Sequence, residues 1–447
     1  MGHSAPASPR PPFRLRPPRV PPRAQSRQGS RPPPQPLGLR DGWQRRALRR
    51  AEVVSSGLSW QSSDTAQRIG DIGTMQPDAW LLAAAAALPT LALCLIVARA
   101  MRRERPVRVG TVSGLNIYPI KSCAGVPSAQ LSLDRHGPVG DRRLMVVAND
   151  VVDDYNVADI CLPFLTQRQE PRMALIRAAL SADGRSVQLS MAGRPDLTTD
   201  LPGPAGPSLL VRVWRDQMLA RDCGDDAATW LTAALDRPCR LVSASHDMYE
   251  RHIDAGYVPA WLRWWPGGPS VGFADGFPLL LLSTASLDAL NARCAANGKA
   301  NGDPPSEPLP MARFRPNVTV DGVSGAFAED GWRRVRIGEA TFRVVKGCSR
   351  CKITTTDQRT AQQGHAIGAD GVTPEPLYSL GAGGFRKRVG EVYFGQNLVH
   401  EWPMPVWWCV LRWWRGLPMA PRVRVGDAVE LLEAGPPVWD RVSPDPE

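Results

Sequence analysis

Two cysteines in a C-x-x-C arrangement are the residues of this chain whose type and spacing most directly suggest chemistry. Cys348 and Cys351 lie in the run Gly347–Thr355, and the chain has no second cysteine pair to complete a structural zinc site. The β-branched residues 353–356 predict a strand, whereas a thioredoxin-like dithiol should open a helix. A single thiolate that ligates a soft metal suits the pattern better.

Basic side chains in several turns suggest that the chain binds an anion. The most suggestive groups are Lys121 with Ser122, Arg142 after Asp141, and Arg315 beside Asn317. Guanidinium groups bind phosphate in a bidentate way, and Lys and Ser add further donors. Each of these residues taken singly is more often a solvated surface residue, so the argument rests on their combination.

Composition bounds the class of protein. The chain has 447 residues, of which 43% are apolar and 22% charged, as in ordinary globular proteins with two or three domains. Residues 1–74 hold 13 arginines and 4 acidic residues, or +9 of the net charge of +11. The remainder is nearly neutral, which argues against nucleic-acid binding. Nine scattered cysteines do not form a secreted disulfide framework and indicate a reducing compartment.

The N-terminal part predicts a membrane anchor rather than a folded domain. Residues 1–74 are rich in Arg and Pro and are predicted to be disordered. Residues 79–98 carry no charge, and twenty helical residues span about 30 Å, the thickness of a bilayer core. Arginines crowd the C-terminal side, so the positive-inside rule places the rest of the chain in the cytosol. A cleaved signal peptide or a buried helix is the alternative.

From Val107 onward, short apolar or alternating runs predict many strands and few helices. The predicted fold class is therefore mainly β with some α, built from β-barrels. Helices are predicted at 225–234 and 283–294, a polar loop at 295–308, and a closing hairpin at 422–431. Two tryptophan-rich runs, 261–265 and 407–415, fit a membrane interface and surface packing about equally well.

These runs occur in an order that resembles one family. From about Val107 to Leu432, the chain resembles the MOSC proteins with an N-terminal β-barrel domain, and among them the mitochondrial amidoxime reducing components. The resemblance is carried, in chain order, by Tyr118–Cys123, Asp141–Arg142, Thr166–Arg172, Gly224, Pro278–Leu280, Ser286–Leu287, Phe314–Asn317, Cys348–Cys351 and Phe394–Gln396. Composition and resemblance together predict five segments: a disordered segment 1–74, an anchor 75–105, an N-terminal β-barrel domain 106–244, a MOSC domain 245–435 and a tail 436–447.

The resemblance also implies roles for single residues. Cys351 would be the molybdenum ligand, and Cys348 would support it. Asp275 would face the cofactor and help to orient substrate or protons. The other cofactor-binding positions it implies are Lys121, Ser122, Arg142, Gly276, Phe277, Arg315, Asn317, Ser349, Arg350 and Asn397. The family has different residues at 276, 277 and 397, which affects the expected shape of the substrate pocket.

The activity implied by the resemblance is a membrane-anchored reductase that contains the molybdenum cofactor. It would act on N-hydroxylated compounds such as amidoximes and hydroxylamines, with electrons from NADH through a cytochrome b5 reductase and cytochrome b5. The mitochondrial outer membrane is the expected location.

Two other functions stay open at this point. One is a sulfur-carrying MOSC protein that takes part in cofactor sulfuration. The sulfurases of that group carry a pyridoxal-phosphate domain, and only 106 residues precede the MOSC region here. The other is a tethered binding protein without activity, against which the basic residues and Cys351 argue.

Overall fold

The computed structural model describes residues 106–149, 161–244, 251–259, 269–301, 307–364, 373–401 and 420–439, all within one compact unit, Leu95–Glu447. The predicted disordered segment 1–74, the anchor 79–98 and both tryptophan-rich runs lie outside these ranges. Within the ranges, no helix is long and apolar enough to cross a membrane.

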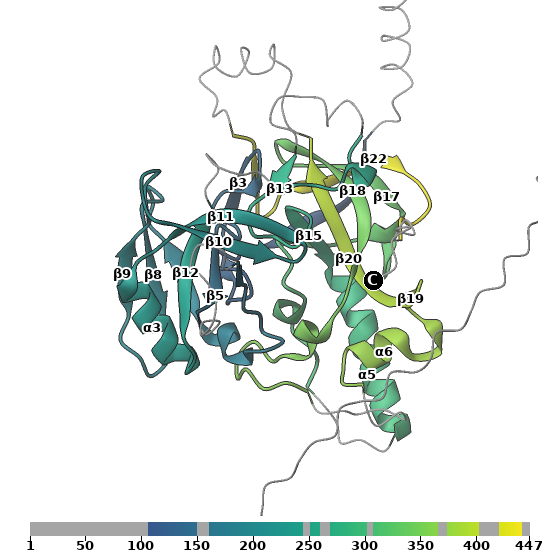
Figure 1. Cartoon of the computed structure of the whole chain (residues 1–447). Coiled ribbons are helices and arrows are strands. Elements are labelled where there is room, and N and C mark those ends of the chain that lie inside the picture. Colours follow the sequence, from purple (N-terminus) through teal and green to yellow (C-terminus); the bar gives the residue numbers. More distant parts are fainter. Residues whose placement is uncertain are drawn as a thin grey trace, which may run out of the picture. The chain divides into compact units, whose positions relative to one another are not determined.

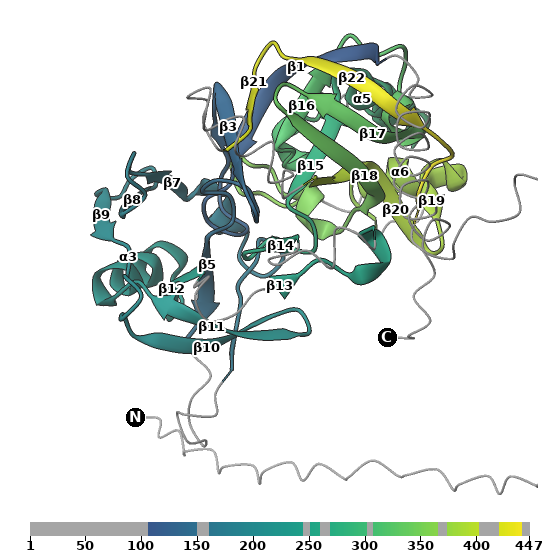
Figure 2. The same cartoon turned by 90° about the horizontal axis from the view of Figure 1, so that it is seen from above.

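Seven of the described strands close into a barrel (Figure 1; β1 and β16 are labelled in Figure 2). In ring order they are β15 (Leu279–Ser283), β16 (Val318–Asp321), β1 (Val107–Ile117), β22 (Ala428–Ala434), β17 (Trp332–Ile337), β18 (Ala340–Ser349) and β20 (Glu391–His400). The pairing of β20 with β15 completes the ring, and β15 with β16 is its parallel pair. Closure leaves none of these seven strands with an unpaired edge. The expectation of a mainly β chain that contains a β-barrel is confirmed.

The first strand of the barrel comes from the segment that was predicted to be a separate N-terminal domain. β1 precedes residue 245, yet it pairs with β16 on one side and β22 on the other. The barrel is therefore built from both predicted domains, and the boundary at 245 stays a prediction.

Most of the remaining N-terminal strands form two open sheets, which Figure 2 shows to one side of the barrel strands. One sheet has the order β5 (Leu144–Ala148), β12 (Cys239–Ala244), β11 (Asp216–Asp222), β10 (Ser208–Val213) and β6 (Leu162–Pro163). The other contains β7 (Arg177–Leu180), β8 (Ser186–Ser190) and β9 (Leu197–Asp200). The predicted N-terminal barrel is not closed by the described strands. At the edge of the larger sheet, β6 is two residues long and ends in Pro163, which has no N–H to donate.

Helix α3 (Asp225–Leu235) confirms the predicted helix at 225–234. It begins after Gly224, whose φ of 92° places it in the left-handed region. Asp225 and Asp226 occupy the first turn, where carboxylates interact favourably with the helix dipole. Leu231 and its buried neighbours pack into the core of the N-terminal sheets.

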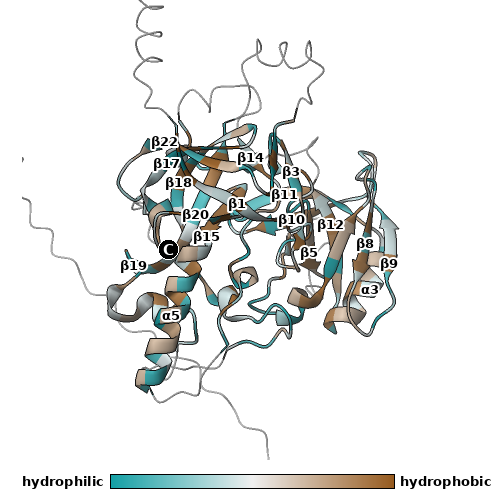
Figure 3. Ribbon diagram, turned by 180° about the vertical axis from the view of Figure 1, so that it is seen from behind, coloured by the Kyte–Doolittle hydropathy of each residue, from teal (hydrophilic) through white to brown (hydrophobic). Residues whose placement is uncertain are grey.

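Helix α5 (Thr284–Asn301) is longer than the sequence predicted. Ser283 is its N-cap, since the Ser283 hydroxyl accepts a hydrogen bond from the Ser286 N–H at 3.1 Å. The helix continues to Asn301, so the expected loop from residue 295 is wrong for 295–301. The short helix α6 (Leu377–Gly381) supports this extension, because Asn297 donates to the Ser379 hydroxyl at 2.8 Å. Figure 3 shows hydrophilic and hydrophobic colours mixed along α5 and along most strands.

Strand β15 is buried on both of its faces. Leu279 and Leu281 belong to the barrel core, whereas Leu280 and Leu282 pack with residues of α5. Successive side chains of a strand point to opposite sides, so a continuous apolar run suits a strand between two cores. This burial fixes the position of the loop that precedes β15.

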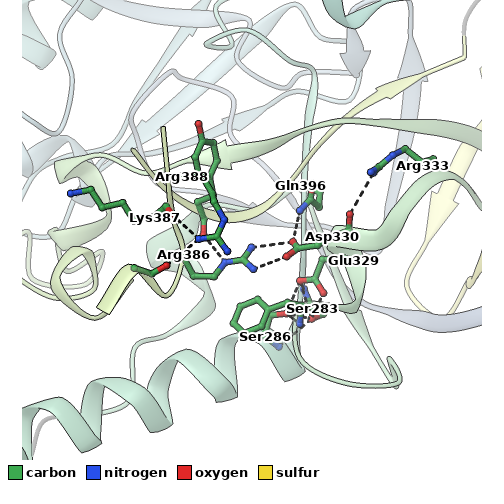
Figure 4. Close-up of polar contacts among 12 residues, drawn as sticks. Ser283, Ser286, Glu329, Asp330, Arg333, Arg386, Lys387, Arg388 and Gln396 are labelled. Atoms are coloured by element: carbon green, nitrogen blue, oxygen red, sulfur yellow. Dashed lines mark hydrogen bonds and ion pairs between the residues drawn. The ribbon is translucent and has the colours of Figure 1, made fainter. Parts of the chain in front are cut away.

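A buried polar network lies beside the start of α5 (Figure 4). The Glu329 carboxylate accepts from the hydroxyls of Ser283 and Ser286 at 3.1 and 2.7 Å. Burial raises the pKa of Glu329. The carboxylate of the neighbouring Asp330 accepts hydrogen bonds from both terminal nitrogens of Arg386, at 2.6 and 3.0 Å. These groups satisfy one another inside the protein, as buried polar groups must.

Two local predictions are wrong. β21 (Arg422–Arg424) pairs with β3 (Gln130–Asp134), not with β22, so 422–431 is not a hairpin. Residues Lys352–Thr355 form a 3-10 helix, η7, rather than a strand. The hydroxyls of Thr354 and Thr355 donate to main-chain carbonyls three residues earlier, at 3.0 and 2.8 Å, which stabilises the turn against an extended conformation. The remaining short strands are β2 (Val126–Pro127), β4 (Gly137–Pro138), β13 (Arg251–His252), β14 (Ser270–Val271) and β19 (Lys387–Arg388).

Candidate functional site

Segments that are far apart in the sequence meet at one end of the barrel. The parallel strands β15 and β16 both start there, and β1, antiparallel to β16, ends there. The loop 275–277 precedes β15, and Lys121 follows β1. Arg350, just after β18, donates to the Phe314 carbonyl at 3.0 Å, and this hydrogen bond brings the segment 348–351, with its two cysteines, to the same end of the barrel.

A cavity of about 720 Å³ lies between these segments. All twelve residues expected at the site line it: Lys121, Ser122, Arg142, Asp275, Gly276, Phe277, Arg315, Asn317, Ser349, Arg350, Cys351 and Asn397. The structure therefore brings the predicted residues together, while their individual roles stay predictions.

The lining is strongly basic. Among the described residues, eight cationic side chains line the cavity: Lys121, Arg142, Arg168, Arg313, Arg315, Lys346, Arg350 and Lys352. Two carboxylates, Asp275 and Glu391, face them. This excess of positive charge suits a ligand with several negative charges, such as a phosphate ester.

The two cysteines differ in their surroundings. Cys351 is exposed and caps the start of η7, where its main-chain oxygen accepts from Thr354 at 3.1 Å. Cys348 is half-buried and packs against the apolar cluster around Phe394. Burial raises the pKa of the Cys348 thiol. Of the pair, Cys351 is thus the better placed to offer a thiolate to a ligand in the cavity.

Several lining residues have a left-handed backbone, which is uncommon for side chains other than glycine. The φ angles are 65° at Ser122, 47° at Arg142, 58° at Trp214 and 56° at Arg315. Each such residue costs on the order of 1 kcal/mol or more, and such residues cluster at functional sites. The strain is compatible with a site that directs particular side chains into the cavity.

A hydrogen-bonded network holds Arg142. Its guanidinium pairs with Asp141 and donates to Asn317 Oδ1 at 3.0 Å. The Asn317 amide in turn donates to Asp141 at 2.9 Å and accepts from the Leu280 N–H at 3.2 Å. Asn317 is fully buried, and its hydrogen bonds fix Arg142 and the start of β15.

Lys121 and Asp275 form an ion pair on the cavity wall. Lys121 is buried and also donates to the Phe273 carbonyl at 2.8 Å, whereas the Asp275 side chain is 67% exposed. Burial lowers the pKa of Lys121, and Asp275 opposes this change. Desolvation raises the pKa of Asp275, but Lys121, Trp214 and Arg142 outweigh it and leave that pKa well below its ordinary range. Asp275 is therefore an ionised carboxylate that faces the cavity.

The remaining predicted residues have supporting positions. Arg350 donates to the carbonyls of Phe314 and Phe394, which commits most of its guanidinium to the main chain. The Asn397 amide reaches the Gly347 carbonyl at 3.4 Å. Phe277 packs edge-on against Tyr257, with ring centroids 5.3 Å apart.

Residues that were not assigned to the site from the sequence also line or support it. Trp214, in the turn between β10 and β11, donates its indole N–H to Asp275 at 3.0 Å, and Arg168 stacks on its ring. A tryptophan beside charged residues at a strand end is a signal that could have identified it. Buried Arg251 supports the 272–275 loop, and nothing in its local sequence points to that role.

Within the described part of the chain, no three His, Cys, Asp or Glu side chains are grouped so that they could hold a metal ion. A metal bound at this cavity by Cys351 would accordingly need other ligands from the group that carries it. The residues present fit such a group, because an exposed thiol and eight cations surround a single cavity.

Comparison with known proteins identifies both halves of the described chain. A family model described as the MOSC N-terminal beta barrel domain matches residues 109–238, and one described as the MOSC domain matches residues 268–430.

Individual relatives are similar over most of the same region. The chain is 36% identical to the mitochondrial amidoxime-reducing component 1 of Mus musculus over 290 residues, which are 63% of this chain and 76% of that protein. The chain is 33% identical to the mitochondrial amidoxime-reducing component 1 of Homo sapiens over 294 residues, which are 63% of this chain and 77% of that protein. A molybdenum cofactor sulfurase of Danio rerio is 28% identical over 302 residues, which are 65% of this chain but 32% of that protein.

Proposed function

Since the chain belongs to the family of MOSC-domain proteins that includes the mitochondrial amidoxime-reducing components, we propose that it is a molybdenum-cofactor-dependent reductase of N-hydroxylated compounds. The observation that carries the proposal is the exposed thiol of Cys351 on the wall of a cavity lined by eight cationic side chains. A soft-metal ligand and a polyanion-binding surface are the two features that this cofactor needs from a protein.

Particular residues would hold the cofactor. Cys351 would ligate the metal, because thiolate binds soft metals and this thiol is exposed. Lys121, Arg142 and Arg315 would bind the phosphate and the pterin, with Ser122 as a further donor. Ser349, Gly276 and Phe277 would contribute to the walls.

When bound, the cofactor supplies two-electron, oxygen-atom-transfer chemistry. For an amidoxime, the net reaction breaks the N–O bond, consumes two electrons and two protons, and releases the amidine and water. The contribution of the chain is to bind the anionic cofactor in a basic cavity and to orient the substrate. The ionised Asp275 is suited to accept a hydrogen bond from the substrate or to pass on a proton.

We extend the proposal to the electron source and the location. Electrons would come from NADH through a cytochrome b5 reductase and cytochrome b5, and residues 79–98 would anchor the chain in a membrane, in the first instance the mitochondrial outer membrane. The uncharged run at 79–98 and the mitochondrial names of the relatives support this part.

A second candidate is a sulfur-handling role in cofactor maturation. The similarity to a molybdenum cofactor sulfurase favours it, as does an exposed cysteine that could carry a persulfide. This reading predicts a persulfide on Cys351 and no bound molybdenum.

The experiment that tests the proposal uses the full-length protein in detergent. Metal analysis should find about one molybdenum per chain, and benzamidoxime should be converted to benzamidine with NADH, cytochrome b5 reductase and cytochrome b5 as electron supply. Omission of cytochrome b5 should abolish turnover by NADH. Protein without molybdenum, or molybdenum-loaded protein that does not reduce benzamidoxime under chemical reduction, would contradict the proposal.

A further inference from the structure

A buried arginine outside the cavity lining holds the main chain around Asp275. Arg251 is 5% exposed, and its guanidinium donates to the carbonyls of Gly272, Ala274 and Asp275 at 3.0, 2.7 and 3.2 Å. Its Nε donates to the Asp216 carboxylate at 2.8 Å. One side chain therefore links the loop that carries Asp275 to the turn between β10 and β11.

The same turn also holds the side chain of Asp275. Trp214 donates its indole N–H to Asp275 Oδ1 at 3.0 Å, and its ring packs edge-on against Phe164 with centroids 5.2 Å apart. The Arg168 guanidinium lies 4.7 Å from the Trp214 ring centroid. A hairpin of the N-terminal sheet thus fixes both the main chain and the carboxylate of Asp275.

The charge of the cavity indicates what this carboxylate is for. The eight cations suit an anionic cofactor, and such a cofactor gains nothing from a neighbouring carboxylate. Asp275 neutralises Lys121, but the Asp275 side chain is 67% exposed. Part of its carboxylate is therefore open to a ligand in the cavity as well. Carboxylates accept strong hydrogen bonds from N–H groups, so the partner that suits Asp275 is a substrate with an N–H donor.

We propose that Arg251 is a positioning residue: together with Trp214, it holds the Asp275 carboxylate where it accepts a hydrogen bond from an amino group of the substrate. The inference rests on the proposed reductase function and adds to it one contact between the protein and the substrate. Loss of that contact should affect amidoximes, which carry an NH2 group beside the N–OH, more than aldoximes, which carry a hydrogen in its place.

The test compares benzamidoxime with benzaldoxime on the full-length, cofactor-loaded protein. Arg251→Lys keeps the positive charge but removes the guanidinium group, which donates to several acceptors at once. Trp214→Phe keeps an aromatic ring but removes the indole N–H. Arg386→Lys is the matched control, because Arg386 is 7% exposed, pairs with Asp330 and donates to a carbonyl, but does not line the cavity (Figure 4).

The expected result is selective for substrate. In Arg251→Lys the KM for benzamidoxime should rise about tenfold, the change expected from loss of one charge-assisted hydrogen bond. The KM for benzaldoxime should change little. Trp214→Phe should change KM in the same direction by a smaller factor, and it carries the test if Arg251→Lys does not fold. Arg386→Lys should leave the ratio of the two substrates unchanged.

A binding measurement provides a readout that does not depend on turnover. Benzamidine, the reduction product, presents the same amino group, and calorimetry should find its Kd weakened about tenfold in Arg251→Lys and unchanged in Arg386→Lys. Equal effects on both oximes, or equal effects of Arg251→Lys and Arg386→Lys, would overturn the inference alone. A wild-type protein that reduces neither oxime would overturn the proposed function and this inference with it.

Discussion

Arg142 and Arg315 share one aromatic ring: their guanidinium carbons lie 4.6 and 4.3 Å from the ring centroid of Tyr118. Both cations line the cavity. Burial lowers the pKa of Arg315, and the positive charge of the neighbouring Arg142 lowers it further. Tyr118 is buried and donates its hydroxyl to the Pro316 carbonyl at 3.2 Å. The ring offers a π surface to two like charges that lie close to each other.

Replacing Tyr118 should therefore separate the role of the ring from that of the hydroxyl. Tyr118→Phe removes one hydrogen bond and should lower the free energy of unfolding by about 1 kcal/mol, with cofactor retention unchanged. Tyr118→Leu removes the ring and should weaken cofactor retention up to about thirtyfold, since it removes two cation–π contacts worth roughly 1 kcal/mol each. Thermal unfolding and the fluorescence of the oxidised pterin released from purified protein measure the two effects. Equal pterin content in both variants would show that the ring does not organise the two arginines.

The two cysteines should respond differently to removal of the thiol. Cys351→Ala should abolish reduction of benzamidoxime and lower the molybdenum content, because it removes the proposed metal ligand. Cys348→Ala should mainly cost stability, by about 1 kcal/mol, because this side chain packs against the cluster around Phe394. Molybdenum per chain and turnover should be measured on both variants. If Cys348→Ala proved the more damaging of the two, the ligand assignment would be wrong.

The sequence predicted residues of the site better than the fold that carries them. Cys351, Arg142 and Arg315 were identified by residue type and motif, and the structure places all of them at one cavity. By contrast, the sequence did not predict that β1 pairs with β22, because this pairing joins residues about three hundred positions apart and leaves no local signal.

The errors in local structure have a similar cause. Residues 353–356 are β-branched and favour a strand, but hydroxyl-to-carbonyl hydrogen bonds of two threonines stabilise a 3-10 turn there. Arg251 was overlooked because its role depends on carbonyls of a distant loop, and a sequence does not display main-chain acceptors.

Gly395 is a position where even a methyl group should be harmful. Its φ is 82°, and a Cβ would lie 2.8 Å from Leu282 Cγ and 2.9 Å from the Leu281 carbonyl. Gly395→Ala should lower the free energy of unfolding by roughly 3 kcal/mol, from backbone strain and a steric clash together. Gly390→Ala is the matched control, with φ of 83° and no atom within 4 Å, and should cost about 1 kcal/mol. Denaturant unfolding measures both, and equal losses would refute the close contact at Gly395.

Stability should depend on pH through His400. This side chain is buried and bonds the Asp134 carbonyl through Nε2 at 2.7 Å, and burial lowers the pKa of His400 from 6.5 to about 4. Between these values the unfolded chain binds a proton that the folded protein does not, so stability is lost as pH falls from about 6.5 to 4. The loss should amount to about 3 kcal/mol. Denaturant titrations of the wild type and of His400→Gln at several pH values measure it, and parallel pH profiles for the two proteins would contradict the assignment.

The ring order of the barrel has a consequence for biosynthesis. β1 is among the first described residues to leave the ribosome, but its barrel neighbours are β16 at 318–321 and β22 at 428–434. Synthesis proceeds at roughly 5–20 residues per second, so one edge of β1 stays without its partner for many seconds after the strand emerges. During that time the nascent chain presents an unpaired β edge, the feature that makes β proteins prone to intermolecular pairing. A ribosome that stops before Ala428 would release a chain in which β1 and β17 both lack the strand that joins them.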